Sequence, residues 1–179
     1  MTWETLSSEY IVHHKYFVAR KDRCRMQDGK IIDPYFVVEL PPTATALALT
    51  DDGKVVLVKQ YRHPIGEVIY ETPGGFIDPG EDAVTGMKRE LLEETGYTAA
   101  SWRYLATLHP CIGYSDERLI YYFAQELSFQ GANLDEGEHL EIFTLTLATA
   151  LEWVKTGKIT DNKSVSGLFW AEKVLREEW

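Results

Sequence analysis

The stretch from Gly75 to Tyr97 constrains this chain more than any other, because a glycine-rich turn leads directly into a short helix that is dense in carboxylates. Residues 83–95 have helical character, and Gly96 suits the left-handed conformation that ends a helix. At about 100° per residue, one arc of this helix carries the carboxylates of Glu90, Glu93 and Glu94. The neighbouring apolar stripe, which is expected to dock on a core, consists of Val84, Met87 and Leu91.

Carboxylates at this spacing repel one another, at a cost of roughly a few tenths of a kcal/mol for each exposed pair. A hard divalent cation offsets this repulsion, and Mg²⁺ prefers carboxylate oxygens completed by waters and phosphate oxygens. The alternative is a solvated acidic helix face, the usual interpretation of such a cluster. The glycines, Glu81, Arg89 and Gly96 stand at fixed intervals around the cluster, and the resemblance to a known family that they carry implies a site for Mg²⁺, or for Mn²⁺ in its place. Glu81 is expected either to hold the turn against the helix or to reach a second metal.

Read in order, these positions give the pattern G-x5-E-x7-R-E-U-x-E-E-x-G-U, where U is a bulky apolar residue, here Leu91 and Tyr97. The pattern resembles the signature of the Nudix hydrolases at every fixed position. The resemblance implies an α/β fold, the Nudix α/β/α sandwich with a mixed sheet. It also implies a metal-dependent hydrolase that acts on a nucleotide derivative.

The length and composition fit one ordinary domain with a small appended piece, since the chain has 179 residues and 45% of them are hydrophobic. A net charge of −10 argues against nucleic acid as a partner, because phosphates demand a basic footprint. Cys24 and Cys111 lack metal-ligand spacing and are expected to be free, buried thiols. The sequence has no signal-peptide pattern and no apolar run of membrane-spanning length, so a soluble, cytoplasmic enzyme without a membrane partner is expected.

Turn signals and apolar runs divide the chain into a β-rich arm over residues 1–42 and a hydrolase domain over residues 43–179. The arm, a small antiparallel β piece, is expected to hold strands over 10–20 and 31–40, with a hairpin signal at Asp28-Gly29. In the domain, further strands are expected at 44–49, 55–60, 67–71, 102–108, 119–125 and 140–145. The acidic helix is expected to be followed later by helices near 147–155 and 164–176.

Segments outside the signature narrow the resemblance to the ADP-ribose and nucleoside diphosphate sugar pyrophosphatases. They are the QYR run at 60–62, ETPGG at 71–75, GYSDER at 113–118, the acidic loop at 135–138 and the tail at 150–171. In that branch the N-terminal β piece is exchanged across a homodimer and helps to form the substrate site, so the resemblance implies the same here. One departure is Ile112, where ADP-ribose-directed members carry a proline, and this leaves the sugar end of the substrate open.

Glu90 and Glu94, one helical turn apart, are the expected metal ligands, with Glu93 in support. The resemblance adds the backbone carbonyl of Gly74 as a further ligand. Arg89 is expected to reduce the repulsion among the carboxylates and to fix their orientation, so it joins Glu93 in the catalytic group.

A general base must reach the nucleophilic water without being consumed as a tight metal ligand. The acidic loop is the better source, because a mobile loop can close over bound substrate. Glu136 matches the position implied by the resemblance best, and Glu138 is the alternate. Taken alone, the acidic loop would be interpreted as a solvent-exposed loop without a catalytic role. The Nudix signature in the same chain favours the catalytic role.

Arg62 is expected to clamp a phosphate through its fork of donors, or else to be a surface arginine at a strand end. Glu71 is a candidate to bind ribose hydroxyls or a base. Glu117, beside Ser115, is expected to contact the terminal sugar, or only to pair with the adjacent arginine. The candidates for stacking on the nucleobase are Trp3, Tyr16 and Phe17, although a core or dimer contact is the more usual role for each.

The first functional hypothesis is a Mg²⁺-dependent pyrophosphatase of nucleoside diphosphate sugars, ADP-ribose included, that releases a nucleoside monophosphate and a sugar phosphate. One alternative is an enzyme specific for ADP-ribose. Another is a Nudix enzyme for a different nucleotide class, such as oxidised nucleoside triphosphates, against which the N-terminal β piece and the QYR run speak. A third is a ligand-sensing regulator without catalysis, against which the intact signature and the lack of a basic segment speak.

Glutamine substitutions test the expected division of labour among the carboxylates. Glu94→Gln should nearly abolish turnover and weaken the Mg²⁺ dependence, because it removes a charged metal ligand. Glu136→Gln should lower kcat while leaving metal affinity almost intact, because a general base acts only in the chemical step. Steady-state kinetics across a Mg²⁺ titration measures both effects. Wild-type rates in Glu136→Gln together with a loss in Glu138→Gln would show that the base is misassigned.

Overall fold

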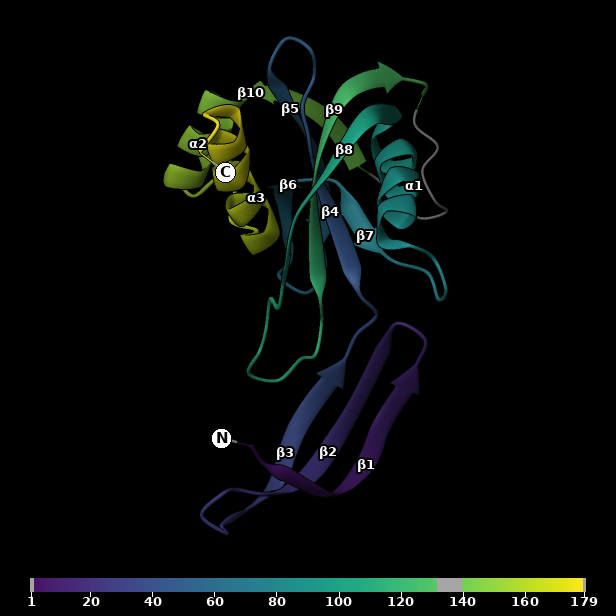
Figure 1. Ribbon diagram of the computed structural model, residues 1–179, viewed down its shortest axis with the longest axis vertical. Helices are drawn as coiled ribbons and strands as arrows, with labels where there is room; N and C mark the ends of the chain where they lie inside the picture. Colours follow the sequence, from purple (N-terminus) through teal and green to yellow (C-terminus); the bar gives the residue numbers. More distant parts are fainter. Residues whose placement is uncertain (1, 132–139, 179) are drawn as a thin grey trace. The chain divides into compact units, whose positions relative to one another are not determined.

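The computed structural model describes residues 2–131 and 140–178, and the chain divides into two compact units (Figure 1). The first, called the N-terminal unit below, comprises residues 1–42 together with 109–118. The second, called the main unit, comprises residues 43–108 and 119–179. Among the described residues, no helix is long and apolar enough to cross a membrane.

The N-terminal unit is built on a three-stranded antiparallel sheet in the order β1-β2-β3. Its strands are β1 (Glu4–His14), β2 (Phe17–Arg25) and β3 (Ile31–Glu39). The loop 109–118 is attached to β3, because the N–H of Val38 donates to the carbonyl of Tyr114 at 2.7 Å. The hydroxyl of Tyr35 also donates to the carbonyl of Gly113 at 2.8 Å.

The predicted single strand over residues 10–20 is wrong, because the chain reverses direction within it. β1 and β2 pair with each other from Glu4↔Arg25 to His14↔Phe17, so the connection between them is the two-residue turn Lys15-Tyr16. Neither residue is a Gly, Asn or Asp, the usual residues of a two-residue hairpin turn. Strand pairing along the whole hairpin fixes the turn, so the local sequence gave no signal of it.

The main unit contains two sheets. A four-stranded mixed sheet has the order β7-β4-β9-β8, in which β4 and β9 are parallel and the other pairs antiparallel. Its strands are β4 (Thr43–Ala48), β7 (Gly74–Phe76), β8 (Tyr97–Leu108) and β9 (Leu119–Phe129). An antiparallel sheet in the order β10-β5-β6 consists of β5 (Lys54–Arg62), β6 (Glu67–Glu71) and β10 (Leu140–Thr146).

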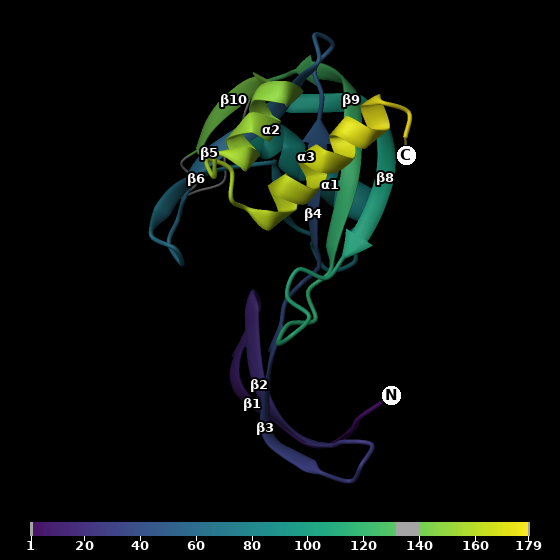
Figure 2. The ribbon, with the colours of Figure 1, turned by 90° about the vertical axis from the view of Figure 1, so that its left-hand side faces the viewer.

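Helices cover both sides of these sheets, with α1 (Ala83–Thr95) on one side and α2 (Leu147–Lys155) and α3 (Asn162–Leu175) on the other (Figures 1 and 2). The residues of β4 alternate between two cores, as side chains do along any strand. Ala44, Ala46 and Ala48 pack with Met87 and Leu91 of α1. On the opposite face, the core that includes residues of α2 and α3 contains Leu47, Leu57, Tyr121, Phe123, Ala150 and Leu168. The predicted mixed α/β sandwich is therefore confirmed.

Helix α1 has the bounds that its sequence predicts. The side chain of Asp82 accepts from the N–H of Thr85 and begins the helix. Gly96 adopts the left-handed conformation at φ 70°, and its N–H donates to the carbonyl of Leu92. Met87 and Leu91 are fully buried, so the predicted apolar stripe does dock the helix.

Other element bounds differ from those predicted because strand pairing and capping extend them. β8 begins at Tyr97 and β9 ends at Phe129, since these two residues pair with each other. α3 begins at Asn162, where Asp161 caps it. The short strand β7 was not predicted; it contains Gly74 and Gly75, so the glycines expected to form a turn instead pair with β4 as an extended strand. Both cysteines are free; Cys24 is buried as expected, whereas Cys111 is partly exposed.

Gly167→Ala tests the packing of α3 on β4. A Cβ added at Gly167 would lie 2.6 Å from Cδ2 of Leu47, a residue that is itself buried. Overpacking is expected to lower the free energy of unfolding by about 1–3 kcal/mol, although alanine is the better helix former. The control Ser166→Ala, on the same helix, should change it by less than about 0.5 kcal/mol. Urea unfolding measures both, and equal stability of the two variants would contradict this packing.

Candidate active site

The guanidinium of Arg89, on α1, is surrounded by carboxylates. Its Nη1 donates to Oε1 of Glu90 at 2.7 Å and to Oε2 of Glu93 at 3.0 Å. Its Nη2 donates to Oε2 of Glu81 at 3.2 Å and to the backbone carbonyl of Phe76 at 3.1 Å. One cation thereby joins the helix, the strand β7 and the turn between them.

Hydrogen bonding within this cluster favours the charged forms of Arg89 and Glu81. The hydrogen bond to Glu81 is the main reason that the pKa of Arg89 is raised, and the bonds to Glu90 and Glu93 add to it against the effect of burial. The pKa of Glu81 is lowered, chiefly by the same hydrogen bond from Arg89. Because the cluster is partly exposed, its ion pairs add little to stability, and their main effect is to orient the carboxylates.

Glu94 joins α1 to Gly74, the first residue of β7, from a buried position. It is 4% exposed, and its Oε2 accepts from the backbone N–H of Gly74 at 2.9 Å. The next residue, Gly75, lies against Glu90, whose Cδ would be 2.5 Å from any Cβ at that position. Only glycine therefore lets the helix carboxylates approach β7 this closely.

The chemistry of these donors fits a hard divalent cation. The carboxylates of Glu90, Glu93 and Glu94 and the carbonyl of Gly74 offer the oxygen ligands that Mg²⁺ prefers. In residues 2–131 and 140–178, no three side chains of His, Cys, Asp or Glu are grouped so that they could hold a metal ion. Glu90 and Glu93 are instead directed at Arg89. Metal binding would therefore require carboxylates to turn away from the guanidinium.

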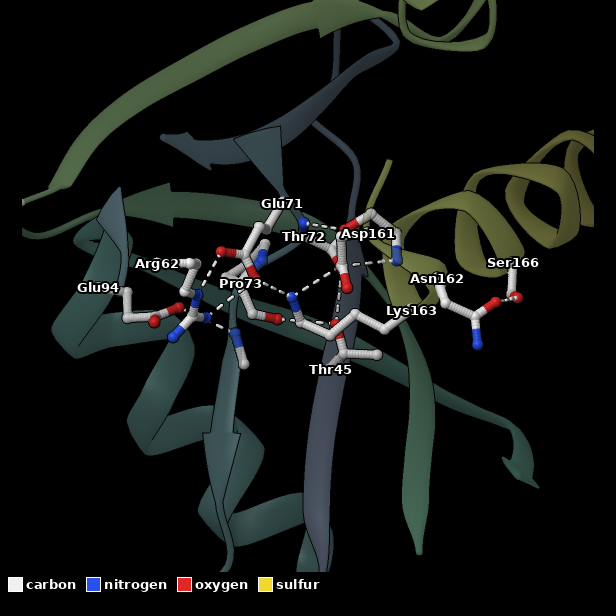
Figure 3. A network of polar contacts seen from close by, with 12 residues as sticks. Thr45, Arg62, Glu71, Thr72, Pro73, Glu94, Asp161, Asn162, Lys163 and Ser166 are labelled. Carbon is white, nitrogen blue, oxygen red and sulfur yellow. Dashed lines mark hydrogen bonds and ion pairs between the residues drawn. The ribbon is translucent and has the colours of Figure 1, made fainter. Parts of the chain in front are cut away.

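A second charged cluster lies where β6 ends (Figure 3). The side chain of Glu71 is 3% exposed, and its Oε1 accepts from Nε of Arg62 at 2.6 Å. Its Oε2 accepts from Nη2 of Arg62 at 2.9 Å and from Nζ of Lys163 at 2.5 Å. Lys163 also contacts Oδ2 of Asp161 at 2.9 Å. Glu71 thus orients two cations, and its predicted contact with ribose or a base stays a prediction.

The charged forms of Glu71, Asp161 and Arg62 in this second cluster are favoured by their neighbours. Burial opposes ionisation of Glu71, but the hydrogen bond from Arg62 and the charge of Lys163 outweigh it, so the pKa of Glu71 is lowered. The same balance holds for Asp161, where burial is outweighed by the charge of Lys163 and the hydrogen bond from Ser164. The hydrogen bond to Glu71 raises the pKa of Arg62 against the effect of burial. Two cations and two carboxylates therefore balance one another.

The remaining predicted substrate residues belong to the N-terminal unit. Oγ of Ser115 accepts from the backbone N–H of Glu117 at 3.1 Å, so these two residues form one local turn. Tyr16 and Phe17 lie at the hairpin between β1 and β2, where both are exposed. Their roles in substrate binding stay predictions.

The two predicted bases, Glu136 and Glu138, lie outside the described residues. Sequence reasoning missed Lys163 and Asp161, which the fold brings to Glu71. The available signal was the spacing of Asp161 and Ser164, which is typical of a helix N-cap and marks the start of α3. The contact with Glu71 itself had no signal, because it joins residues 92 positions apart.

Comparison with known proteins identifies the family of this chain. Residues 39–165 match the NUDIX domain, and residues 3–38 match the nucleoside diphosphate sugar hydrolase N-terminal domain. The ADP-ribose pyrophosphatase of Bacillus subtilis (strain 168) is 35% identical over 152 residues, which cover 76% of this chain and 82% of that protein. The GDP-mannose pyrophosphatase of Escherichia coli O1:K1 / APEC is 33% identical over 174 residues, which cover 89% and 87%.

A solved structure shares the fold. The crystal structure of an ADP compounds hydrolase matches with a TM-score of 0.88 and 22% identity, over 99% of this chain and 96% of that one. Together with the match of the NUDIX domain to most of the chain, this confirms the predicted membership. The chain belongs to the Nudix family and is a Nudix hydrolase.

Glu71→Gln tests the charged cluster at β6 through its pH dependence. The pKa of Glu71 is lowered from its ordinary value of 4.5, so its ionised form contributes stability that is present above pH 4.5 and is lost as the pH falls through the folded-state pKa. The variant should lose about 1–3 kcal/mol of unfolding free energy at neutral pH, and the loss should narrow below pH 4.5. Urea unfolding at a series of pH values measures it.

The matched control is Glu67→Gln, at the exposed start of the same strand. Its unfolding free energy should stay within about 0.5 kcal/mol of the wild type at every pH. If Glu71→Gln and the wild type instead differed by the same amount at all pH values, the ionised form of Glu71 would not carry the stabilisation.

Proposed function

We propose that this enzyme hydrolyses the pyrophosphate bond of nucleoside diphosphate sugars, ADP-ribose included, in a Mg²⁺-dependent reaction that Mn²⁺ can also support. The observation that carries the proposal is the cluster around Arg89, which holds the carboxylates of Glu81, Glu90 and Glu93 beside the glycines of β7, where Glu94 accepts the N–H of Gly74. Such a concentration of oxygen donors next to a backbone carbonyl suits a cation that itself binds a diphosphate.

In the reaction, the oxygen of water forms a bond to one phosphorus atom and the bridging P–O bond breaks. A nucleoside monophosphate and a sugar phosphate result, and the proton of the attacking water passes to a base. When bound, Mg²⁺ supplies the positive charge that lets the diphosphate accept a nucleophile. Glu90 and Glu94 would hold it, with Glu93 and the carbonyl of Gly74 in support, while Arg89 keeps the carboxylates in place.

We assign the general base to the acidic loop, with Glu136 as the first choice and Glu138 as the alternate. A carboxylate outside the cluster of Arg89 is suited to this role, because it can be ionised without being bound to metal. Arg62 is assigned to the substrate phosphates. Its side chain is 41% exposed although Nε and Nη2 are engaged by Glu71, so it can offer further N–H donors to an anion.

The proposed substrate range is supported by the names of the relatives and by one residue, Ile112, that differs from the ADP-ribose-directed members. Relatives of similar identity are named for ADP-ribose and for GDP-mannose, which supports a nucleoside diphosphate sugar as the common substrate class. Ile112, at a position where ADP-ribose-directed members carry proline, supports a range wider than ADP-ribose alone. An enzyme specific for ADP-ribose is the second candidate.

We further propose that the enzyme is a cytoplasmic homodimer in which residues 1–42 are exchanged between protomers. The match of residues 3–38 to the nucleoside diphosphate sugar hydrolase N-terminal domain supports a part for this segment in substrate binding. Ser115 and Glu117 are assigned to the sugar end of the substrate, and Tyr16 and Phe17 to the base. Their exposed rings are suited to stacking.

Incubation with Mg²⁺ and a panel of sugar nucleotides tests this function. We expect a nucleoside monophosphate to be released from ADP-ribose and from at least one of ADP-glucose, UDP-glucose and GDP-mannose, as identified by chromatography. EDTA should abolish the reaction, and added Mn²⁺ should restore it. Cleavage of ADP-ribose alone would establish the second candidate. Hydrolysis of nucleoside triphosphates only, or binding without hydrolysis, would overturn the proposal.

A further inference from the structure

Helix α3 begins with a lysine in a position that the helix dipole disfavours. Lys163 lies in the first turn of α3, where backbone N–H groups give the helix end a partial positive charge. The repulsion between the lysine and this partial charge is offset by two carboxylates. Nζ of Lys163 lies 2.9 Å from Oδ2 of Asp161 and 2.5 Å from Oε2 of Glu71. Asp161 is the N-cap of α3 and also accepts from the N–H and the Oγ–H of Ser164. One of the two carboxylates that hold Lys163 is therefore fixed at the start of the same helix.

Lys163 and Arg62 share one buried carboxylate. Glu71 gives one oxygen to Nε of Arg62, while its other oxygen serves both Nη2 of Arg62 and Nζ of Lys163 (Figure 3). A buried carboxylate demands cationic partners, since an unpaired buried charge is costly. The second cation divides this demand and leaves Arg62 with capacity for another anion.

The same helix end also holds the segment that follows Glu71. Oγ of Ser164 accepts from the N–H of Thr72 at 2.7 Å, and the hydroxyl of Thr72 lies 2.7 Å from that of Thr45. Thr45 in turn donates to the carbonyl of Pro73 at 2.9 Å. All these hydroxyls are buried, so the backbone between β6 and β7 has a fixed place.

The two cations differ in what they can reach. The side chain of Lys163 is 15% exposed and lies between two carboxylates of its own chain, whereas that of Arg62 is 41% exposed. The exposed group is the better candidate to contact a substrate phosphate. Lys163 is therefore suited to act on the substrate through Arg62.

We propose that Lys163 is a positioning residue for the diphosphate subsite, which it serves by sharing Glu71 and so presenting the guanidinium of Arg62 to the phosphates. This proposal rests on the proposed function, in which Arg62 binds those phosphates. In this proposal, α3 contributes to substrate affinity without touching the substrate.

Lys163→Met removes the charge while keeping most of the side-chain volume. KM for ADP-ribose should rise about tenfold, the order expected for one charge-assisted hydrogen bond, while kcat stays within about threefold. Lys163→Arg should recover most of the affinity. Lys155→Met, at an exposed position on α2, is the matched control and should behave as the wild type. Urea unfolding shows whether each variant folds, and Lys163→Gln replaces Lys163→Met if the latter does not.

The decisive comparison is made in the Arg62→Ala background. Because Lys163 acts through Arg62, adding Lys163→Met to Arg62→Ala should weaken affinity no further. Binding of inorganic pyrophosphate, measured by calorimetry, should show the same pattern without any turnover. Additive losses in the double variant would mean that Lys163 contacts the ligand itself and would overturn the proposal. The proposal would also be overturned if folded Lys163→Met had the same KM and the same pyrophosphate affinity as the wild type.

These outcomes separate the two proposals. If the wild type hydrolyses none of the sugar nucleotides, the proposed function fails, and pyrophosphate binding still tests Lys163. If the wild type hydrolyses ADP-ribose and the variants bind as it does, only the role of Lys163 fails.

Discussion

The site depends on one guanidinium that holds together charges which would otherwise repel. Arg89 contacts the carboxylates of Glu81, Glu90 and Glu93, and through the carbonyl of Phe76 it also fixes strand β7. Without a cation at this point, the turn and the helix would present like charges to each other at short range. The lack of a side chain at Gly75 lets the helix approach strand β7, and Arg89 orients the carboxylates that meet there.

The segment from Glu71 to Phe76 is held by both helical layers of the sandwich. From α1, Glu94 accepts the N–H of Gly74. From α3, Lys163 pairs with Glu71 and Ser164 accepts the N–H of Thr72. Fixing a backbone segment costs conformational entropy, and here polar contacts from two sides offset that cost. The arrangement gives Gly74 and Gly75 of β7 a defined place, as a preorganised site requires.

How far the sequence predicts this protein can be seen in α1 and in the N-terminal hairpin. The signals that predicted α1 are local: an apolar stripe repeats at helical spacing and Gly96 ends the helix. The hairpin at Lys15-Tyr16 has no local signal, because pairing along β1 and β2 fixes a turn whose residues do not favour one. The attachment of loop 109–118 to β3 likewise joins distant residues through backbone hydrogen bonds, which no side-chain pattern announces.

The sequence by itself determined the family, the α/β class, and the carboxylate-bearing helix with its arginine and glycines, because these depend on spacing within a short stretch. Only the tertiary structure decided the partners of Glu71. Arg62 reaches it across the β5–β6 hairpin, and Lys163 reaches it from the far end of the chain. Such contacts are set by where the sheets and helices pack, and packing is a property of the whole core rather than of any local pattern.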